Sequence, residues 1–175
     1  MIERIEETRL TDRDDAGIAA LIETCFTSSD FGGRSYFQNR PHLRLVRREG
    51  GRIVGHLGLF LRAVRMGGAL VDVVGIGDVA VHPQARGQRL ATAMVEAAIS
   101  EARQGTAAFA LLFGTRSLYA AAGFVRAGNE VTVTQMRGAR TGAVETWRAQ
   151  ALMVLPLRDA PWDPDAPVDL LGFPF

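Results

Sequence analysis

The chain contains 175 residues, of which 47% are hydrophobic, and its formal net charge is +1. This length suits one domain with a sizeable core, and the hydrophobic content excludes an intrinsically disordered chain. The near-zero charge argues against nucleic acid as a partner, because it provides no bulk electrostatic attraction to phosphate.

The sequence has none of the features of an exported or membrane-inserted protein. Its first residues are too polar for a signal peptide, and no hydrophobic run is long enough to span a bilayer. Cys25 is the only cysteine, which excludes an intramolecular disulfide. We therefore expect a cytoplasmic protein with no membrane partner, in which residues 1–175 form a single domain.

The first forty residues predict one strand and one helix. Residues 2–10 alternate loosely between polar and apolar side chains, as in a strand. Apolar side chains then recur at helical spacing as far as Cys25, and Thr11 or Asp12 is suited to cap the start of that helix. The segment 26–40 mixes aromatic, glycine and hydroxyl residues, and Pro41 ends it.

Three strands joined by two Gly-Gly turns are expected next. The strand patterns cover residues 43–48, 52–65 and 69–81. The third is almost wholly apolar and β-branched, which is typical of a buried central strand. Because Gly-Gly pairs form tight hairpin turns, the turns at 50–51 and 67–68 predict an antiparallel meander.

The pattern becomes helical after this meander. A polar loop spans 82–88, a helix is predicted over 88–104, and a buried strand over 107–113. A strand, a crossover helix and a parallel strand in this order form a right-handed βαβ unit. We therefore expect an α/β fold with a mixed sheet, an antiparallel N-terminal meander, a central βαβ unit and helices on both faces.

The last third of the chain is expected to complete this sheet. A short helix is predicted over 116–122, followed by strands over 131–135 and 151–157, with a surface loop over 137–149 between them. The tail 158–175 is rich in proline, aspartate and aromatic residues. Its composition is unsuited to one continuous helix, and its aromatic residues predict that it packs back on the body.

The loop before the long helix has the features of a phosphate-binding site. The first amides of a helix lack internal partners, and the helix dipole adds partial positive charge there. A diphosphate suits such a site, since Gly87 lets the backbone approach closely and Arg86 and Arg89 add full charges. Taken alone, the pattern also fits an ordinary connection with solvated arginines. A P-loop is excluded, because the sequence contains no lysine.

Two stretches of the sequence resemble the GCN5-related N-acetyltransferase (GNAT) superfamily. One is the strand–loop–helix segment VAVHPQARGQRLATAMVEAA, and the other is RSLYAAAGF, which begins at Arg116. A helix and a strand separate the two, as in that superfamily. The resemblance covers roughly residues 1–157 and implies the GNAT-type fold, with acetyl-CoA as the co-substrate.

The resemblance also implies which residues hold acetyl-CoA. The backbone of 79–81 pairs with the pantetheine arm, and the amides of 84–90 hold the pyrophosphate. Two positions depart from the superfamily pattern. Arg89 stands where a small residue is usual, and the usual asparagine before the tyrosine is absent, so its contact is either missing or made by Thr115. The implied binding residues are Val79, Ala80, Val81, Gln84, Ala85, Arg86, Gly87, Gln88, Arg89, Leu90 and Thr115.

Tyr119 and Asp78 are the candidate catalytic residues. The resemblance places Tyr119 near the thioester sulfur, where it protonates the leaving thiolate; from position alone it is an aromatic residue at the edge of the core. Asp78 interrupts an apolar strand, which is unfavourable unless the carboxylate is hydrogen-bonded or functional. A general base and a structural cap are therefore both open for Asp78.

The histidines and the cysteine are weaker candidates. His82 is a base, a solvated loop residue or a residue that packs on the cofactor, and His56 is expected at the surface or half-buried. Cys25 ends a helix with an apolar face and is expected in the core. No group of His, Cys and Asp has metal-ligand spacing, so we predict no metal.

The segment 26–37 shapes the acceptor pocket in the superfamily. Asp30, Phe31 and Tyr36 are therefore expected to contact a cationic amine. The alternative is a flexible loop with an ordinary polar surface.

Two subgroups of the superfamily are partially similar to this chain. RGQRL, RSLYAAAGF and ALMVLPL resemble aminoglycoside 2′-N-acetyltransferases, whereas GHLGLFLRAVRMGGALVDVVGIGDVAV and FGT resemble nodulation N-acyltransferases. Both imply an amine like that of an amino sugar. We predict an N-acyltransferase that moves an acetyl group from acetyl-CoA to a primary amine of a small molecule by direct attack. The alternatives are a non-catalytic acyl-CoA-binding sensor or subunit and transfer of a longer acyl chain; a homodimer is compatible with the resemblance.

Overall fold

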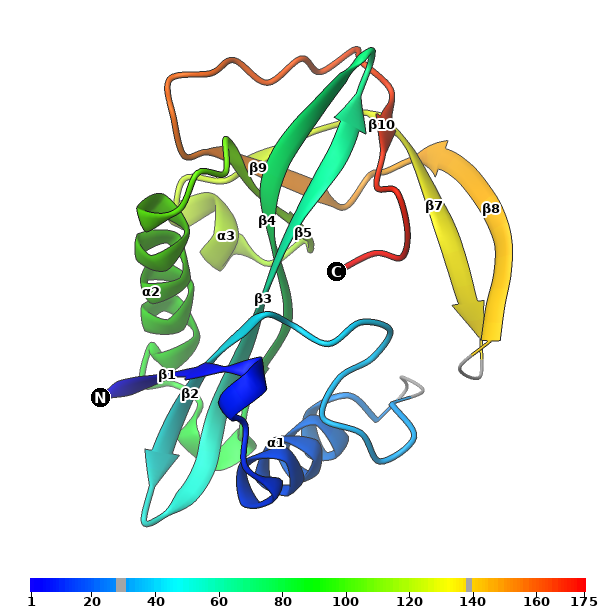
Figure 1. Cartoon of the computed structure of the whole chain (residues 1–175). Coiled ribbons are helices and arrows are strands. Elements are labelled where there is room, and N and C mark those ends of the chain that lie inside the picture. Colours follow the sequence, from blue (N-terminus) through cyan, green and yellow to red (C-terminus); the bar gives the residue numbers. More distant parts are fainter. Residues whose placement is uncertain (28–30, 138–139) are drawn as a thin grey trace.

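The computed structural model describes residues 1–27, 31–137 and 140–175, which form a strongly twisted mixed sheet flanked by helices (Figure 1). Within these residues the strand order is β6-β9-β5-β4-β3-β10-β7-β8, with β2 paired to both β1 and β3. The α/β fold with an antiparallel meander and a central βαβ unit is confirmed. The elements in chain order are β1 (Ile2–Glu6), the 3-10 helix η1 (Glu7–Arg9), α1 (Asp12–Cys25), β2 (Leu43–Glu49), β3 (Arg52–Met66), β4 (Ala69–Val81), η2 (Pro83–Ala85), α2 (Leu90–Gln104), β5 (Phe109–Phe113), α3 (Ser117–Ala121), β6 (Val125–Arg126), β7 (Glu130–Arg137), β8 (Arg140–Arg148), β9 (Leu152–Pro156) and β10 (Val168–Asp169).

The N-terminal strand is shorter than its sequence pattern predicted. It ends at Glu6, because the Leu10 amide returns to the Glu7 carbonyl over 3.2 Å and closes a helical turn. Thr11 then caps α1, and its hydroxyl accepts a hydrogen bond from the Asp14 amide at 3.2 Å. Acidic residues in the first turn complement the helix dipole.

The central strands run together for only part of their length. β3 and β4 pair antiparallel along almost the whole of both strands. In contrast, β4 and β5 pair in parallel only from Val73 to Gly75 on β4 and from Phe109 to Leu111 on β5. β4 continues to Val81, and no described strand pairs with its last residues on the β5 side. This divergence opens the middle of the sheet.

Helices cover the two faces of the sheet around β3 and β4 (Figure 1). One core cluster joins α2 and α3 to the sheet and includes Met94, Val95 and Tyr119. A separate cluster joins α1 to the sheet and includes Ile18 and Ile22. Among the described residues, no helix combines the length and the apolar character that crossing a bilayer requires.

The prediction of a surface loop over 137–149 is wrong, because β8 occupies residues 140–148. β8 pairs antiparallel with β7, and the hydroxyls of Thr132 and Thr146 lie 2.8 Å apart across the ladder. Every residue of β8 is exposed, so no alternation between buried and polar positions marked it as a strand. Among the described strands β8 pairs with β7 alone, and Figure 1 shows the β7–β8 hairpin as an arm at one side of the molecule.

The tail connects this arm to the central sheet. β10 pairs antiparallel with β3 and parallel with β7. Asn129 anchors the preceding segment: its side-chain amide donates to the carbonyls of Asp163 and Ala166, and its oxygen accepts from Trp162 Nε1 at 2.9 Å. The tail then turns back, and its end lies beside the centre of the sheet (Figure 1).

Candidate active site

A cavity of about 630 Å³ opens where β4 diverges from β5. Its walls come from the last part of β4, the loop and first turn of α2, residues 113–119, the end of α1 and the tail. The described residues that line it are Cys25, Phe26, Phe31, Phe37, Ile76, Gly77, Asp78, Val79, Ala80, Val81, Ala85, Arg86, Gly87, Arg89, Leu90, Ala91, Phe113, Gly114, Thr115, Arg116, Leu118, Tyr119 and Phe175.

A β-bulge shapes β4 at the centre of this cavity. The pairing shifts between His56 and Gly58, so that Asp78 and Val79 together stand opposite a single β3 residue. Asp78 adopts φ 52°, a left-handed conformation that is unfavourable for a residue other than glycine. Such strain persists only where surrounding contacts hold it, and it is concentrated at functional sites.

His56 supplies one of those contacts. The nitrogen Nδ1 of His56 lies 2.9 Å from the Asp78 carbonyl oxygen, and Nε2 lies 3.2 Å from Arg44 Nη1. Because a guanidinium can only donate, Nε2 accepts, and the ring proton therefore sits on Nδ1 and is donated to Asp78. Burial lowers the pKa of His56 to about 3, with a further contribution from the Arg44 charge, so the ring is neutral. The expectation of a surface or half-buried His56 is wrong, since the residue is fully buried.

Arg44 continues this network into the protein. Its side chain is fully buried and forms two hydrogen bonds with Glu7, at 2.6 Å and 3.0 Å, and one with the Ser35 carbonyl at 2.8 Å. Burial favours a raised pKa for Glu7, but hydrogen bonds from Arg44 and Arg40 outweigh it and lower the pKa. Glu7 is therefore ionised and compensates the buried guanidinium.

Asp78 is the acidic side chain among the described residues that line the cavity. The residue is half-buried and lines the cavity, and no described residue donates a hydrogen bond to its carboxylate. Burial raises the pKa of Asp78 to about 6, against the opposing effect of the Arg44 charge. This carboxyl group can exchange a proton near neutral pH, as a general base must.

Tyr119 reaches the same cavity from α3. Its ring packs edge-on against Phe124, with centroids 6.4 Å apart, and a side chain at Gly114 would collide with it. Burial raises the pKa of Tyr119, although the charge of Arg116 acts in the opposite direction. The hydroxyl group therefore stays protonated, and no described residue accepts a hydrogen bond from it.

The loop before α2 leaves a set of amides free. Three amides are already hydrogen-bonded within the turn. The Gln84 amide donates to the His82 ring, the Ala85 amide to the His82 carbonyl, and the Arg86 amide to the Pro83 carbonyl. Within the described part of the chain, the amides of 87–92 have no acceptor, and the Ala93 amide makes the first helical hydrogen bond. The free donors thus begin three residues later than the sequence predicted.

Gly87 and Arg89 give this loop its shape. Gly87 adopts φ 81°, which glycine tolerates without strain. Arg89 immediately precedes α2 at φ 57° and ψ 19°, in the left-handed region. Glycine adopts this conformation without strain, whereas arginine is strained in it. Both residues line the cavity.

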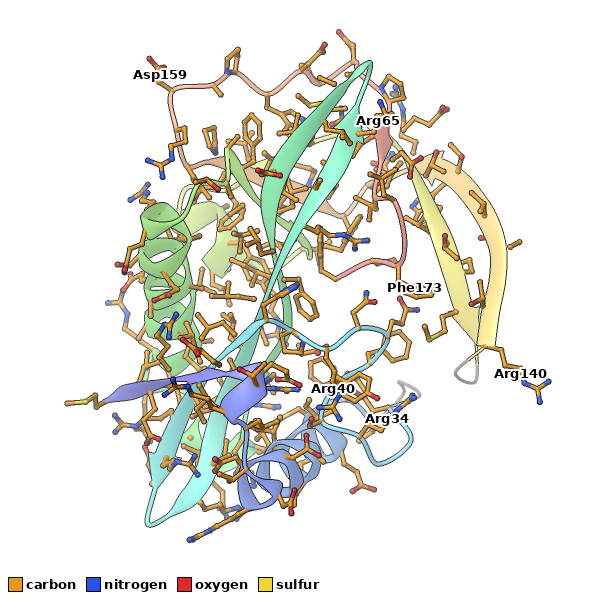
Figure 2. The ribbon with its side chains drawn as sticks, viewed as in Figure 1. Arg34, Arg40, Arg65, Arg140, Asp159 and Phe173 are labelled. Atoms are coloured by element: carbon orange, nitrogen blue, oxygen red, sulfur yellow. The ribbon has the colours of Figure 1, made fainter. Side chains whose placement is uncertain are left out.

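Most of the predicted site residues meet in this cavity, but some do not. Gln84 and Gln88 do not line it, and Asp30 lies outside the described residues. Tyr36 also lies away from it: the guanidiniums of Arg34 and Arg40 lie over its ring, 5.5 Å and 4.4 Å from the centroid. Figure 2 shows both arginines on the loop that leads into β2.

His82 and Cys25 differ from their expected roles. His82 is buried rather than solvated, and its Nε2 lies 2.9 Å from Arg52 Nη2. It does not line the cavity, so a role as base has no geometric support. Cys25 does line the cavity, and its thiol donates to the Val81 carbonyl at 3.4 Å.

Four aromatic residues of the cavity were missed from the sequence: Phe26, Phe37, Phe113 and Phe175. Phe26 and Phe37 lie in the mixed segment already assigned to the acceptor, where only Phe31 was selected. The packing of the tail on the sheet had a signal in β4, because Gly75 and Gly77 leave room for a large side chain on one face of that strand. The ring of Phe175 lies against Gly75, and its backbone lies against Gly77.

A comparison with protein-family models matches residues 7–127 to the acetyltransferase (GNAT) domain. The chain belongs to the GNAT family of acetyltransferases. The class of chemistry is therefore acyl transfer. A search of curated proteins gives no match.

Solved GNAT structures share the fold at low sequence identity. A GNAT family N-acetyltransferase from Escherichia coli in complex with CoA is 22% identical, with a TM-score of 0.64, and covers 97% of this chain and 88% of its own. A GNAT family acetyltransferase from Brucella melitensis in complex with acetyl-CoA is 19% identical, with a TM-score of 0.62. The match covers 96% of this chain and 94% of the Brucella chain. The ribosomal-protein-S18-alanine N-acetyltransferase from Escherichia coli is 18% identical, with a TM-score of 0.56. The match covers 92% of this chain and 97% of that enzyme's chain.

Proposed function

We propose that this GNAT protein transfers the acetyl group of acetyl-CoA to a primary amine of a small molecule by direct attack. One observation carries the proposal: a single cavity joins the free amides at the start of α2 to Asp78 and Tyr119. The first feature suits a diphosphate, and the other two supply a base and an acid to a reaction between them.

The binding of acetyl-CoA follows from the loop and the open strand edge. The amides of 87–92, together with the guanidiniums of Arg86 and Arg89, would hold the pyrophosphate. Arg86 is oriented by a hydrogen bond from its Nε to the Val81 carbonyl at 3.2 Å. The edge of β4 left without β5, including Val79 to Val81, would pair with the amide groups of the pantetheine arm. Two solved GNAT structures of similar fold contain CoA or acetyl-CoA, which supports this choice of donor.

The acyl transfer would use Asp78 and Tyr119 in turn. Asp78 accepts a proton from the bound ammonium, directly or through water, and the neutral amine nitrogen attacks the thioester carbonyl carbon. The C–N bond forms, the carbonyl oxygen gains charge near the Val79 amide, and the C–S bond then breaks. The Tyr119 hydroxyl protonates the leaving thiolate, the resulting phenolate takes the second proton from the nitrogen, directly or through water, and the neutral amide product and CoA dissociate.

Tyr119→Phe tests this proposal against the alternative of a non-catalytic acyl-CoA-binding protein. Because general acid catalysis contributes about 10²- to 10⁴-fold, kcat should fall by a factor in that range. CoA affinity, measured by calorimetry, should stay unchanged. An unmodified protein that binds CoA tightly but acetylates no amine in a broad panel would contradict the proposal and favour a sensor or subunit. Turnover with long-chain acyl-CoA alone would instead favour the longer-acyl alternative.

The nature of the amine is the finer part of the function. The partial resemblance to aminoglycoside and nodulation transferases suggests an amino sugar. The chemistry of the cavity wall gives an independent indication, which differs from that suggestion.

A further inference from the structure

The wall of the cavity near α1 is built from aromatic rings. The ring centroids of Phe26 and Phe31 are 5.4 Å apart, and those of Phe31 and Phe37 are 5.3 Å apart. All three residues line the cavity, and Phe31 is buried. The three rings offer a flat apolar surface to a bound molecule.

The tail contributes a second aromatic group. Phe175 lines the cavity together with Phe113, and their ring centroids are 6.3 Å apart. The side-chain amide of Asn39 donates to the Pro174 carbonyl at 3.2 Å, which joins the tail to the segment before β2. Figure 2 shows the labelled Phe173 of the tail close to that segment. Two separate parts of the chain therefore supply aromatic rings to one cavity.

The charges that line the cavity limit the acceptor further. Among the side chains of the described lining residues, Asp78 carries the only carboxylate, whereas Arg86, Arg89 and Arg116 are positively charged. If the proposed function is right, Arg86 and Arg89 at the α2 loop bind the pyrophosphate of acetyl-CoA. A polyamine such as an aminoglycoside would bring several ammonium groups to a cavity whose described side chains supply one acidic partner, and the unpaired charges would oppose binding.

We propose that the acceptor is a monoamine whose amino group is joined by a short arm to an aromatic or similarly flat apolar group. The amino group meets Asp78, and the apolar group packs on the rings of Phe26, Phe31, Phe37 and Phe175. This inference rests on the proposed acetyl transfer and names the substrate class of the same site. It replaces the amino sugar suggested by the sequence.

The test measures kcat/KM with acetyl-CoA and four amines: 2-phenylethylamine, n-butylamine, D-glucosamine and kanamycin A. We expect 2-phenylethylamine to exceed both sugar amines by about tenfold or more, because burying an apolar group in a matching pocket gives discrimination of this size. A higher kcat/KM for D-glucosamine or kanamycin A would overturn the inference and leave the proposed acetyl transfer standing. Acetylation of none of the four would overturn the inference, and calorimetry with CoA would then show whether the proposed donor site also fails.

A variant tests whether the aromatic wall is responsible for the preference. Phe37→Ala should lower kcat/KM for 2-phenylethylamine about tenfold more than for n-butylamine, because only the ring contacts the lost surface. Phe37→Leu, which keeps apolar volume, should show the same trend and replaces Phe37→Ala if that variant does not fold. The matched control is Leu70→Ala, an exposed position at the start of β4, which should leave the ratio unchanged. Equal losses for both amines in the Phe37 variants would overturn the inference.

Discussion

His56 donates its Nδ1 proton to the carbonyl oxygen of Asp78 across 2.9 Å, and this bond ties a buried ion pair to the strained residue of the cavity. On its other side the ring accepts from Arg44, which is held by Glu7. The chain Glu7–Arg44–His56 thus connects the 3-10 turn after β1 to the bulge in β4. Every member is satisfied, since no buried side-chain nitrogen or oxygen of the described residues lacks a partner.

Replacing His56 by leucine should destabilise the fold. The change removes the donor to the Asp78 carbonyl and one of the two acceptors of the buried Arg44 Nη1, which keeps its hydrogen bond to the Ser35 carbonyl. Leaving a buried polar group unsatisfied reduces the free energy of unfolding by about 1–3 kcal/mol, and more where the group is charged. Urea denaturation measures this change in the free energy of unfolding. His42→Leu is the matched control, because that exposed imidazole also accepts one hydrogen bond, from the Leu61 amide, where water can replace it. Equal losses in the two variants would contradict a special role for the network.

The pH dependence of stability should separate His56 from Asp78. The pKa of His56 is lowered to about 3, so the unfolded chain binds more protons there below pH 6.5, and stability falls as pH falls. The pKa of Asp78 is raised to about 6, so the folded chain binds more protons there, and stability falls as pH rises from about 4 to 6. The two contributions oppose one another between these limits.

Variants make each contribution visible. In Asp78→Asn the contribution of His56 is no longer opposed. The free energy of unfolding of this variant should therefore increase more steeply with pH between 4 and 6 than that of the unmodified protein. The added slope is at most about 1.4 kcal/mol per pH unit, and it is smaller because water in the cavity weakens the shift at Asp78. His56→Gln should change the slope in the opposite sense. Identical slopes in all three proteins, measured by denaturation at several pH values, would rule out both shifts.

The catalytic pH profile tests Asp78 as the base. In the unmodified enzyme, kcat should fall as pH drops below about 6, because protonated Asp78 can no longer accept the proton of the ammonium group. Asp78→Asn should lose this acidic limb and lower kcat by about 10²-fold or more. A variant that retains full kcat and the acidic limb would assign Asp78 to the structural role that the sequence left open.

Local sequence patterns predicted the central part of this fold. The meander, the βαβ unit and the loop at Gly87 follow from apolar runs, glycine pairs and a change of period, all of which depend on neighbours in sequence. β8 lacks such a signal, because both of its faces are exposed. The bulge at Asp78 was also hidden, since it depends on a register shift against β3 and on a buried histidine.

The acceptor side of the site was harder to predict than the donor side. The donor loop is one continuous segment, whereas the aromatic wall combines residues 26–37 with the tail, which are distant in sequence. Tyr36 was selected for its chemistry, but Arg34 and Arg40 lie over its ring and it does not line the cavity. Phe175 reaches the cavity only because β10 threads the tail between β3 and β7.

Arg89→Gly should separate the strain at the α2 loop from its charge. Glycine adopts the left-handed conformation freely, so the free energy of unfolding without ligand should stay equal or rise by up to about 1 kcal/mol. The affinity for CoA should fall several-fold, roughly three- to tenfold, because one cation near the pyrophosphate is lost. Denaturation and calorimetry measure the two effects. Arg148→Gln, at an exposed position of β8, should change neither. Unchanged CoA affinity in Arg89→Gly would mean that this side chain points away from the cofactor.

Gly75→Ala should destabilise the protein through the tail. A methyl group at Gly75 would collide with the Phe175 ring, and overfilling a packed site reduces stability by about 1–3 kcal/mol. The double variant Gly75→Ala with Phe175→Ala removes the collision, so the two losses should be less than additive by about 1 kcal/mol or more, as expected for residues in contact. Gly68→Ala is the control, because an added methyl group there meets no atom within 4 Å. Additive losses in the double variant would show that Phe175 does not lie against β4 in solution, and the aromatic wall of the cavity would then lack its contribution from the tail.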